Sequence, residues 1–225
     1  MNRREFLKVS LAGATTFALS ACGLSFLGGD SKSAAPKVEV KKAGAQGKNL
    51  KVVVITGSPH AKGTSACLAD NFIKGAQEAG HEVFRFNAAF EKINPCTGCN
   101  ICQGSGDCVF SDTFKTNLLP KLLEADVICL VTPLYYYGMS AQLKTVLDRF
   151  YSHTEKLKNK KSVLLTTAWN SSSETFVALL EHYKTLAQYM NWQDMGMVLG
   201  YGCGFRSAVE GSGYPKEAHN LGRNL

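Results

Sequence analysis

The sequence predicts an α/β fold in which a three-layer, doubly wound sheet of five parallel strands carries helices on both faces. Two observations support this prediction. From residue 49 onward, short β-branched runs alternate with longer amphipathic stretches, which is the pattern of a parallel sheet covered by helices. The chain of 225 residues also shows no second apolar core and no internal repeat of about 20–50 residues. One domain is therefore expected over residues 49–225.

The first strand and the helix after it are the clearest elements. Residues 52–55, Val-Val-Val-Ile, form a continuous apolar run, as expected for a strand buried on both faces. Residues 64–79 then carry apolar side chains at helical spacing, and Gly80 ends the helix. The same alternation predicts a strand containing Val83 and Phe86, strands over residues 127–131, 162–166 and 195–199, and helices over residues 113–125, 140–151, 174–189 and 215–223.

The N-terminus carries a predicted export signal. Arg3 and Arg4 precede an apolar stretch, residues 9–21, which is shorter than the roughly 20 residues that span a bilayer. Residues 2–8 resemble the twin-arginine signal, whose pathway exports proteins that have already folded. An ordinary N-terminal helix is the alternative interpretation.

The end of this signal resembles the lipobox of bacterial lipoproteins. Leu-Ser-Ala-Cys at residues 19–22 implies that residues 1–21 are removed and that Cys22 becomes the lipidated first residue. The protein is then expected outside the cytoplasm, on the periplasmic or cell-surface side, with a lipid anchor in the membrane. Cleavage nearby, with Cys22 an ordinary cysteine, is the alternative.

Residues 22–48 are predicted to form a flexible tether, because they are rich in Ser, Ala, Gly and Lys and lack apolar periodicity. The whole chain has a formal net charge of +7, and several of its lysines lie in this tether, where anionic lipid headgroups are the expected partner. No basic helix and no interleaved aromatic patch argues for nucleic acid, so no nucleic-acid partner is predicted.

The loop after the first strand has the composition of a phosphate-binding site. Residues 56–65, Thr-Gly-Ser-Pro-His-Ala-Lys-Gly-Thr-Ser, combine hydroxyls and glycines with a helix N-terminus, whose free N–H groups and dipole favour an anion. The loop has neither the GxGxxG order nor the Lys-Ser/Thr ending of a P-loop, so a monophosphate fits better than a pyrophosphate. Alternatively, Thr64 merely caps the helix.

A turn with three tyrosines follows the third strand and is the expected neighbour of that loop. Ligands of open parallel sheets bind beyond the carboxyl ends of the strands. Tyr135, Tyr136 and Tyr137 would bury their faces against a flat ring system such as isoalloxazine, unless some of them belong to the core. Trp169, after the fourth strand, is a weaker candidate for a third wall.

These motifs resemble a known family. GSPHAKGTS at residues 57–65, TPLYYYGMSAQLKTVLDRF at 132–150 and EAHNLG at 217–222 are similar to the flavodoxin-like NAD(P)H-dependent FMN reductases, over residues 49–225. The resemblance implies strand order 2-1-3-4-5. Many members carry Arg-Lys-Asn where this chain has His-Ala-Lys at 60–62, so an arginine contact to the phosphate is missing. The implied FMN site has Ser58, His60, Gly63, Thr64 and Ser65 at the phosphate, and Pro133, Leu134, Tyr135, Tyr136, Tyr137 and Gly138 beside the ring.

Four of the eight cysteines lie close together in the long loop, residues 94–110: Cys96, Cys99, Cys102 and Cys108. Their spacing resembles the compact motif of the iron-sulfur flavoproteins in the same family, which implies a 4Fe–4S cluster. Zinc would also accept four thiolates, and disulfides are a strong alternative outside the cytoplasm. Two of the remaining cysteines, Cys67 and Cys129, are interpreted as small buried hydrophobes.

The expected function is that of an FMN-dependent oxidoreductase in which the flavin carries the chemistry and no side chain acts as acid or base. Cytoplasmic relatives use NAD(P)H, whereas an exported protein is expected to exchange electrons with a quinone or a redox partner protein and a small-molecule acceptor. The alternatives are a non-enzymatic, membrane-tethered flavin electron carrier and an interaction module without a cofactor. The resemblance also implies a homodimer or homotetramer. His153, His182 and His219 are expected at the surface.

Overall fold

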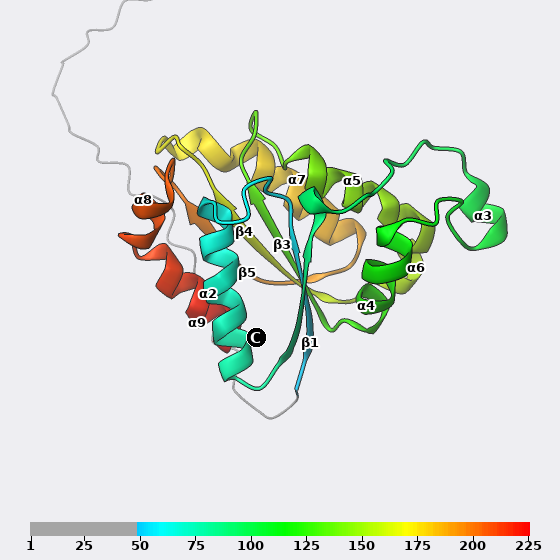
Figure 1. Cartoon of the computed structure of the whole chain (residues 1–225), viewed down its shortest axis with the longest axis horizontal. Helices are drawn as coiled ribbons and strands as arrows, with labels where there is room; N and C mark the ends of the chain where they lie inside the picture. Colours follow the sequence, from blue (N-terminus) through cyan, green and yellow to red (C-terminus); the bar gives the residue numbers. More distant parts are fainter. Residues whose placement is uncertain (1–48) are drawn as a thin grey trace, which may run out of the picture. The chain divides into compact units, whose positions relative to one another are not determined.

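A computed structural model describes residues 49–225 and shows a single five-stranded sheet (Figure 1). All neighbouring strands are parallel, and their order is β2-β1-β3-β4-β5. The predicted fold class and strand order are therefore confirmed. The strands are β1 (Lys51–Thr56), β2 (Glu82–Asn87), β3 (Val127–Pro133), β4 (Lys161–Thr167) and β5 (Gln193–Gly200).

Helices connect the strands and cover both faces of the sheet. The predicted helix over residues 113–125 forms as a π-helical turn, Phe114–Leu118, that continues into α4. Three short helices, α3, α6 and α8, were not predicted, because four or five residues carry too little periodicity to identify. The helices are α2 (Thr64–Glu78), α3 (Ile101–Ser105), α4 (Leu119–Glu124), α5 (Ala141–Arg149), α6 (Thr154–Leu157), α7 (Val177–Tyr189), α8 (Arg206–Glu210) and α9 (Tyr214–Arg223).

Two apolar cores lie on opposite faces of the sheet, because successive side chains of a strand point to opposite sides. Val52 and Val54 join the core under α2, α8 and α9, whereas Val53 and Ile55 join the core under α4, α5 and α7. The two groups of helices lie on either side of the sheet in Figure 1. Cys67 and Cys129 are buried in the first of these cores, as predicted.

Helices α2 and α9 pack with their backbones in contact, through two glycines. A Cβ atom on Gly75 would fall on the carbonyl oxygen of His219, and one on Gly222 would fall on the carbonyl oxygen of Phe72. This contact fixes the C-terminal helix against α2, which begins at the predicted phosphate loop.

The predictions for residues 1–48 lie outside the described residues: the export signal, the lipidation of Cys22 and the tether. Within residues 49–225, none of the helices has both the length and the apolar character needed to cross a bilayer.

Candidate functional site

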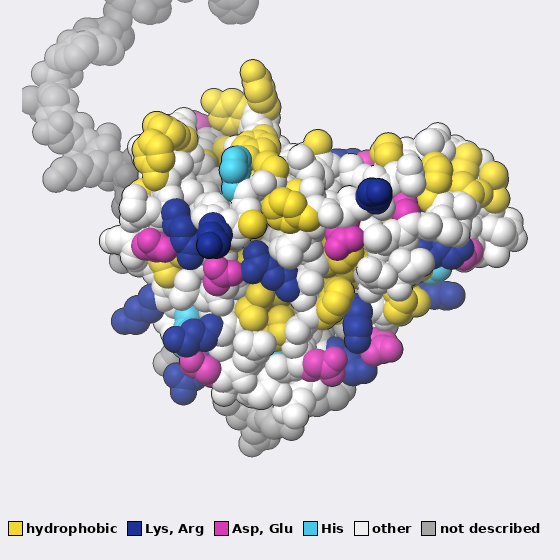
Figure 2. Space-filling view, viewed as in Figure 1, with side chains coloured by type: hydrophobic (Ala, Val, Ile, Leu, Met, Phe, Trp, Pro, Cys, Tyr) yellow, Lys and Arg dark blue, Asp and Glu magenta, His cyan; other side chains and the backbone are white. Residues whose placement is uncertain are grey.

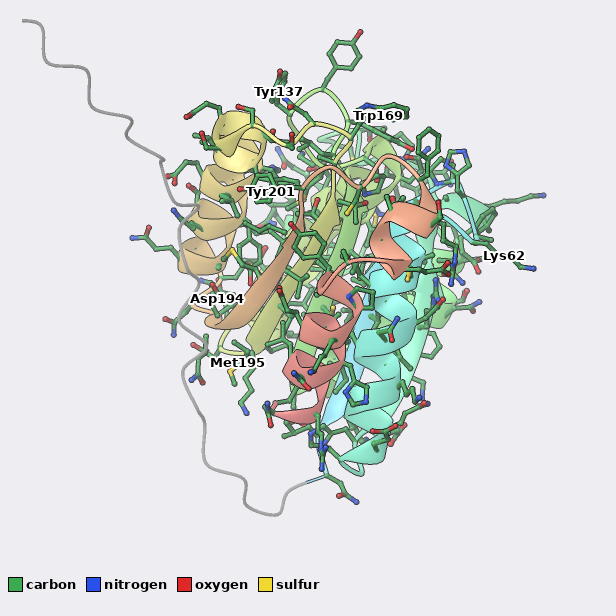
Figure 3. The ribbon with its side chains drawn as sticks, turned by 90° about the vertical axis from the view of Figure 1, so that its left-hand side faces the viewer. Lys62, Tyr137, Trp169, Asp194, Met195 and Tyr201 are labelled. Atoms are coloured by element: carbon green, nitrogen blue, oxygen red, sulfur yellow. The ribbon has the colours of Figure 1, made fainter. Side chains whose placement is uncertain are left out.

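A cleft of about 640 Å³ opens where loops after β1, β3, β4 and β5 meet, at the carboxyl edge of the sheet. This position and size are typical of ligand sites in open α/β sheets. Figure 3 shows Tyr137, Trp169 and Lys62 at this end of the molecule. Seven of the eleven residues predicted for the flavin site line the cleft: Ser58, His60, Gly63, Thr64, Pro133, Leu134 and Tyr135.

The β1–α2 loop leaves the N-terminus of α2 open toward this cleft. The helix begins after Gly63, and no side chain caps it. The hydroxyl of Thr64 pairs instead with that of Thr167 at 2.8 Å, so the interpretation of Thr64 as a simple cap is wrong. The side chain of Ser65 is buried and does not line the cleft. Ser65 could therefore contribute only its backbone N–H to the predicted phosphate site. Free N–H groups at a helix start bind anions well.

Hydrogen bonds hold this loop in a defined shape. The Oγ of Ser58 accepts a bond from the N–H of His60 at 3.1 Å, and the N–H of Gly63 donates to the carbonyl of His60 at 3.0 Å. Ser140, the N-cap of α5, donates its hydroxyl to the carbonyl of Gly57 at 2.8 Å. A Cβ on Gly57 would collide with the Ser140 side chain, so this close approach requires glycine. The loop is thereby tied to the neighbouring βα unit.

The tyrosine turn is a tight, strained reversal. Tyr135 and Gly138 exchange both backbone hydrogen bonds, at 3.1 and 3.0 Å, and φ is 46° at Tyr136 and 63° at Tyr137. Positive φ at both central positions is typical of a type I′ turn and unusual for tyrosine. All three tyrosines are exposed, so none belongs to the core. Of the turn residues 135–138, Tyr135 lines the cleft, whereas Tyr136, Tyr137 and Gly138 do not.

Trp169 forms an aromatic wall together with a residue that was not predicted. Its ring meets that of Phe205 edge to face, with centroids 4.7 Å apart, and both side chains are mostly exposed. Gly204 lies directly under the indole, where a Cβ would collide with the ring. Thr167, Cys203 and Arg206 also line the cleft. Thr167 ends β4, and Cys203 and Arg206 lie in the segment after β5, so the rule that sites lie at strand ends could have identified them.

The charges around the cleft favour an anion. Among the described residues that line it, Lys62 and Arg206 are cationic and none is acidic. The open helix N-terminus adds its positive dipole end. The residues present therefore fit a ligand with one phosphate at the β1–α2 loop and a planar apolar part beside Tyr135 and Trp169.

The four clustered cysteines line a second, small hollow of about 20 Å³. The seven cysteines within the described residues are all free thiols, without disulfides. Nowhere in residues 49–225 do three or more His, Cys, Asp or Glu side chains come together so as to hold a metal ion. The loop over residues 94–110, here called the cysteine excursion, projects from the body with α3 at its end (Figure 1), and Figure 2 shows apolar side chains there.

A buried ion pair fastens both ends of this excursion to α5. Arg149 has a fully buried side chain, and its Nη1 lies 2.7 Å from Asp112 and 2.9 Å from the carbonyl of Asn94. Burial disfavours the Asp112 carboxylate, but hydrogen bonds from Arg149 and Asn94 outweigh this and lower its pKa below the ordinary value. His153, expected at the surface, is instead buried near this excursion, because η3 (Phe150–His153) turns it inward.

Residues 50–201 match the model of the NADPH-dependent FMN reductases. The chain is 38% identical to an iron-sulfur flavoprotein of Archaeoglobus fulgidus over 114 residues, which are 49% of this chain and 51% of that protein. It is 39% identical to an iron-sulfur flavoprotein of Methanocaldococcus jannaschii over 100 residues, 44% of this chain and 51% of the relative. The chain thus spans about half the length of these curated relatives.

Solved structures share the fold. An NAD(P)H:quinone oxidoreductase from Methanothermobacter marburgensis superposes with a TM-score of 0.61 at 17% identity, covering 79% of this chain and 98% of that one. An FMN-dependent NADH-azoreductase of Bacillus anthracis, in complex with FMN, gives 0.58 at 13% identity, covering 77% and 97%. The family match extends over more than half of the chain and includes all five strands, from which we conclude that this protein belongs to the NADPH-dependent FMN reductase family.

Proposed function

We propose that this protein is an FMN-dependent oxidoreductase whose flavin occupies the cleft at the carboxyl edge of the sheet. The observation that carries the proposal is the uncapped N-terminus of α2, which opens on the same cleft as Leu134 and Tyr135. Bound FMN would supply hydride and electron transfer. The chain's own residues would bind and orient it: the loop N–H groups and the Thr64 hydroxyl would hold the phosphate, and Tyr135 and Trp169 would keep water from the ring.

Flavin content and turnover test this proposal. Full-length protein, prepared without oxygen, should be yellow, bind about one FMN per chain and oxidise NADPH with a quinone or free flavin as acceptor. Thr64→Val removes a hydroxyl from the proposed phosphate site, and we expect FMN affinity to fall about tenfold. Thr185→Val, on the exposed face of α7, is the matched control. Colourless, folded protein that refuses added FMN would refute the proposal.

The second candidate function is a non-enzymatic electron carrier. The exposed rim formed by Tyr136, Tyr137 and Trp169 favours it, since a flavin beneath an exposed rim is accessible to another protein. Rapid steady-state turnover with small-molecule donors and acceptors supports the enzyme. Stoichiometric reduction without turnover, followed by electron transfer to a redox protein, supports the carrier.

We propose further that the four clustered cysteines bind a 4Fe–4S cluster. Four free thiols line one hollow, and Gly98, Gly104 and Gly106 stand in open space, which leaves the excursion room to close around a cluster. Anaerobic protein should contain about four irons and four sulfides, and Cys102→Ser should lose them whereas the buried Cys67→Ala keeps them. Zinc in place of iron, or two disulfides in place of four thiols, would contradict this.

The proposed location is the outer side of the cytoplasmic membrane or the cell surface, with a lipid on Cys22. A pair of lysines in place of Arg3 and Arg4 should hold the protein in the cytoplasm, because the twin-arginine signal is lost. Cys22→Ala should release it from the membrane fraction. The proposed partners outside the cytoplasm are a quinone or a redox protein. The proposed assembly is a homodimer or homotetramer, and light scattering would measure it.

A further inference from the structure

Residues 57–63 of the β1–α2 loop contain no arginine, but an arginine from another part of the chain lies against this loop. Arg206, the first residue of α8, lines the cleft and donates a hydrogen bond from Nη1 to the carbonyl of Lys62 at 3.3 Å. The two residues are 144 positions apart in the sequence. The fold thus places the Arg206 guanidinium beside the β1–α2 loop.

Two carboxylates pair with the Arg206 guanidinium. Glu210, one turn further along α8, accepts from Nε at 2.7 Å, and Asp70 of α2 lies 3.7 Å from Nη2. Neither carboxylate lines the cleft. The hydrogen bond to Glu210 raises the pKa of Arg206 above its usual range, so the side chain is charged at every relevant pH. An arginine has five N–H donors, so Nη1 and Nη2 keep donors without a partner among the described residues.

Lys62, the other cation of the cleft, is less suited to fix a ligand. Its side chain is exposed and extends away from the protein (Figure 3). A flexible ammonium loses conformational entropy on binding, whereas a guanidinium already held by Glu210 loses less and can grip two phosphate oxygens at once.

We propose that Arg206 is a ligand of the FMN phosphate and supplies a guanidinium that the β1–α2 loop itself does not contain. This inference rests on the proposed function. It predicts that Arg206 contributes to the binding of FMN and contributes nothing to the binding of riboflavin, which has the same ring without the phosphate.

The test is the affinity ratio between FMN and riboflavin, measured on full-length protein by quenching of flavin fluorescence. In Arg206→Gln, FMN affinity should fall about 10- to 100-fold, with riboflavin affinity unchanged. The loss should shrink at high salt, because ions screen the charge. Arg85→Gln is the matched control, since Arg85 also pairs with Asp70, at 2.7 Å, but lies outside the cleft.

Other outcomes overturn the inference. If Arg206→Gln keeps the wild-type ratio, or weakens both flavins equally, Arg206 has only a structural role. If Arg206→Gln does not fold, Arg206→Lys replaces it: a reduced ratio in the folded lysine variant supports the inference, and an unchanged ratio refutes it. Wild-type protein that binds neither flavin refutes the proposed function and this inference together, whereas an unchanged variant of an FMN-binding protein refutes the inference alone.

Discussion

Tyr136 and Tyr137 both have positive φ, a backbone conformation that residues with a side chain rarely adopt. Such a conformation costs about 1 kcal/mol per residue in an ordinary turn. The strain persists because Tyr135 and Gly138 close the turn with two hydrogen bonds. A strained reversal that projects exposed aromatic rings beside a cleft is typical of functional rather than structural turns.

Replacing Tyr137 by glycine should therefore stabilise the protein. Glycine adopts positive φ without strain, so the free energy of unfolding should rise by about 0.5–1 kcal/mol in urea titration. Tyr135→Gly is the control, because Tyr135 has no positive φ and gains nothing. Equal destabilisation by both variants would contradict the strain account.

Arg149 and Asp112 give a second prediction at this scale. Arg149→Met leaves a buried carboxylate without its partner and should lower the free energy of unfolding by about 3–5 kcal/mol. Proteolysis should also increase within residues 94–110, because that segment loses its fastening. Lys144→Met is the control: its pair with Asp148 is about half exposed and should be worth less than about 1 kcal/mol. A small effect of Arg149→Met would show that the excursion is held by other contacts.

Among the elements, α2 and α9 are the pair whose packing the sequence does not reveal. Gly75 and Gly222 look like weak points in two helices, since glycine disfavours a helix by about 1 kcal/mol relative to alanine. In the structure they let the two backbones touch. Tertiary packing, and not helix propensity, therefore explains glycine at these two positions.

Gly222→Ala should consequently destabilise the protein although alanine is the better helix former. The added methyl would fall on the backbone of α2, and we expect a loss of about 1–3 kcal/mol. Gly104→Ala in α3 is the matched control, since its methyl meets nothing within 4 Å, and it should be neutral or slightly stabilising. Thermal unfolding followed by circular dichroism measures both. A neutral Gly222→Ala would mean that α9 shifts at little cost.

For the whole molecule, stability should depend on pH through two partly buried histidines, His81 and His182. Burial is the main cause that lowers the pKa of His81 and of His182, with Lys161 and Lys144 adding to it respectively. A lowered pKa means that the unfolded chain binds protons more readily than the fold. Stability is then fully present above the unfolded value of about 6.5 and declines as the pH falls through the folded values.

The measurement is the urea midpoint between about pH 8 and pH 5. Wild-type protein should lose stability over the acidic part of this range, and a His81→Gln, His182→Gln double variant should lose less. Asp112 acts in a separate window, because its lowered pKa gives stability that is lost only as the pH falls below about 4. Identical slopes for the wild type and the double variant would refute the assignment to these histidines.

Much of the fold was predictable because its signals are local. Val52 to Ile55 form an unbroken apolar run, the stretch starting at Thr64 has helical periodicity, and both became the expected elements. The β1–α2 loop and the tyrosine turn could be placed at one site, since parallel strands end at a common edge. The sequence did not predict the helices of four or five residues. It also did not predict the burial of His153, which depends on the short 3₁₀ helix Phe150–His153.

The sequence alone determined the α/β class, the succession of strands and helices and the two loops that approach the ligand, since hydrophobic periodicity and glycine or proline placement act over a few residues. Only the tertiary structure decided three contacts between distant parts of the chain. These are the hydrogen bond between Thr64 and Thr167, the ion pair of Arg149 with Asp112, and the hydrogen bond from Arg206 to the β1–α2 loop. These partners stand 37 to 144 residues apart. The packing of helices on the sheet brings them together, and no local preference of the chain encodes that.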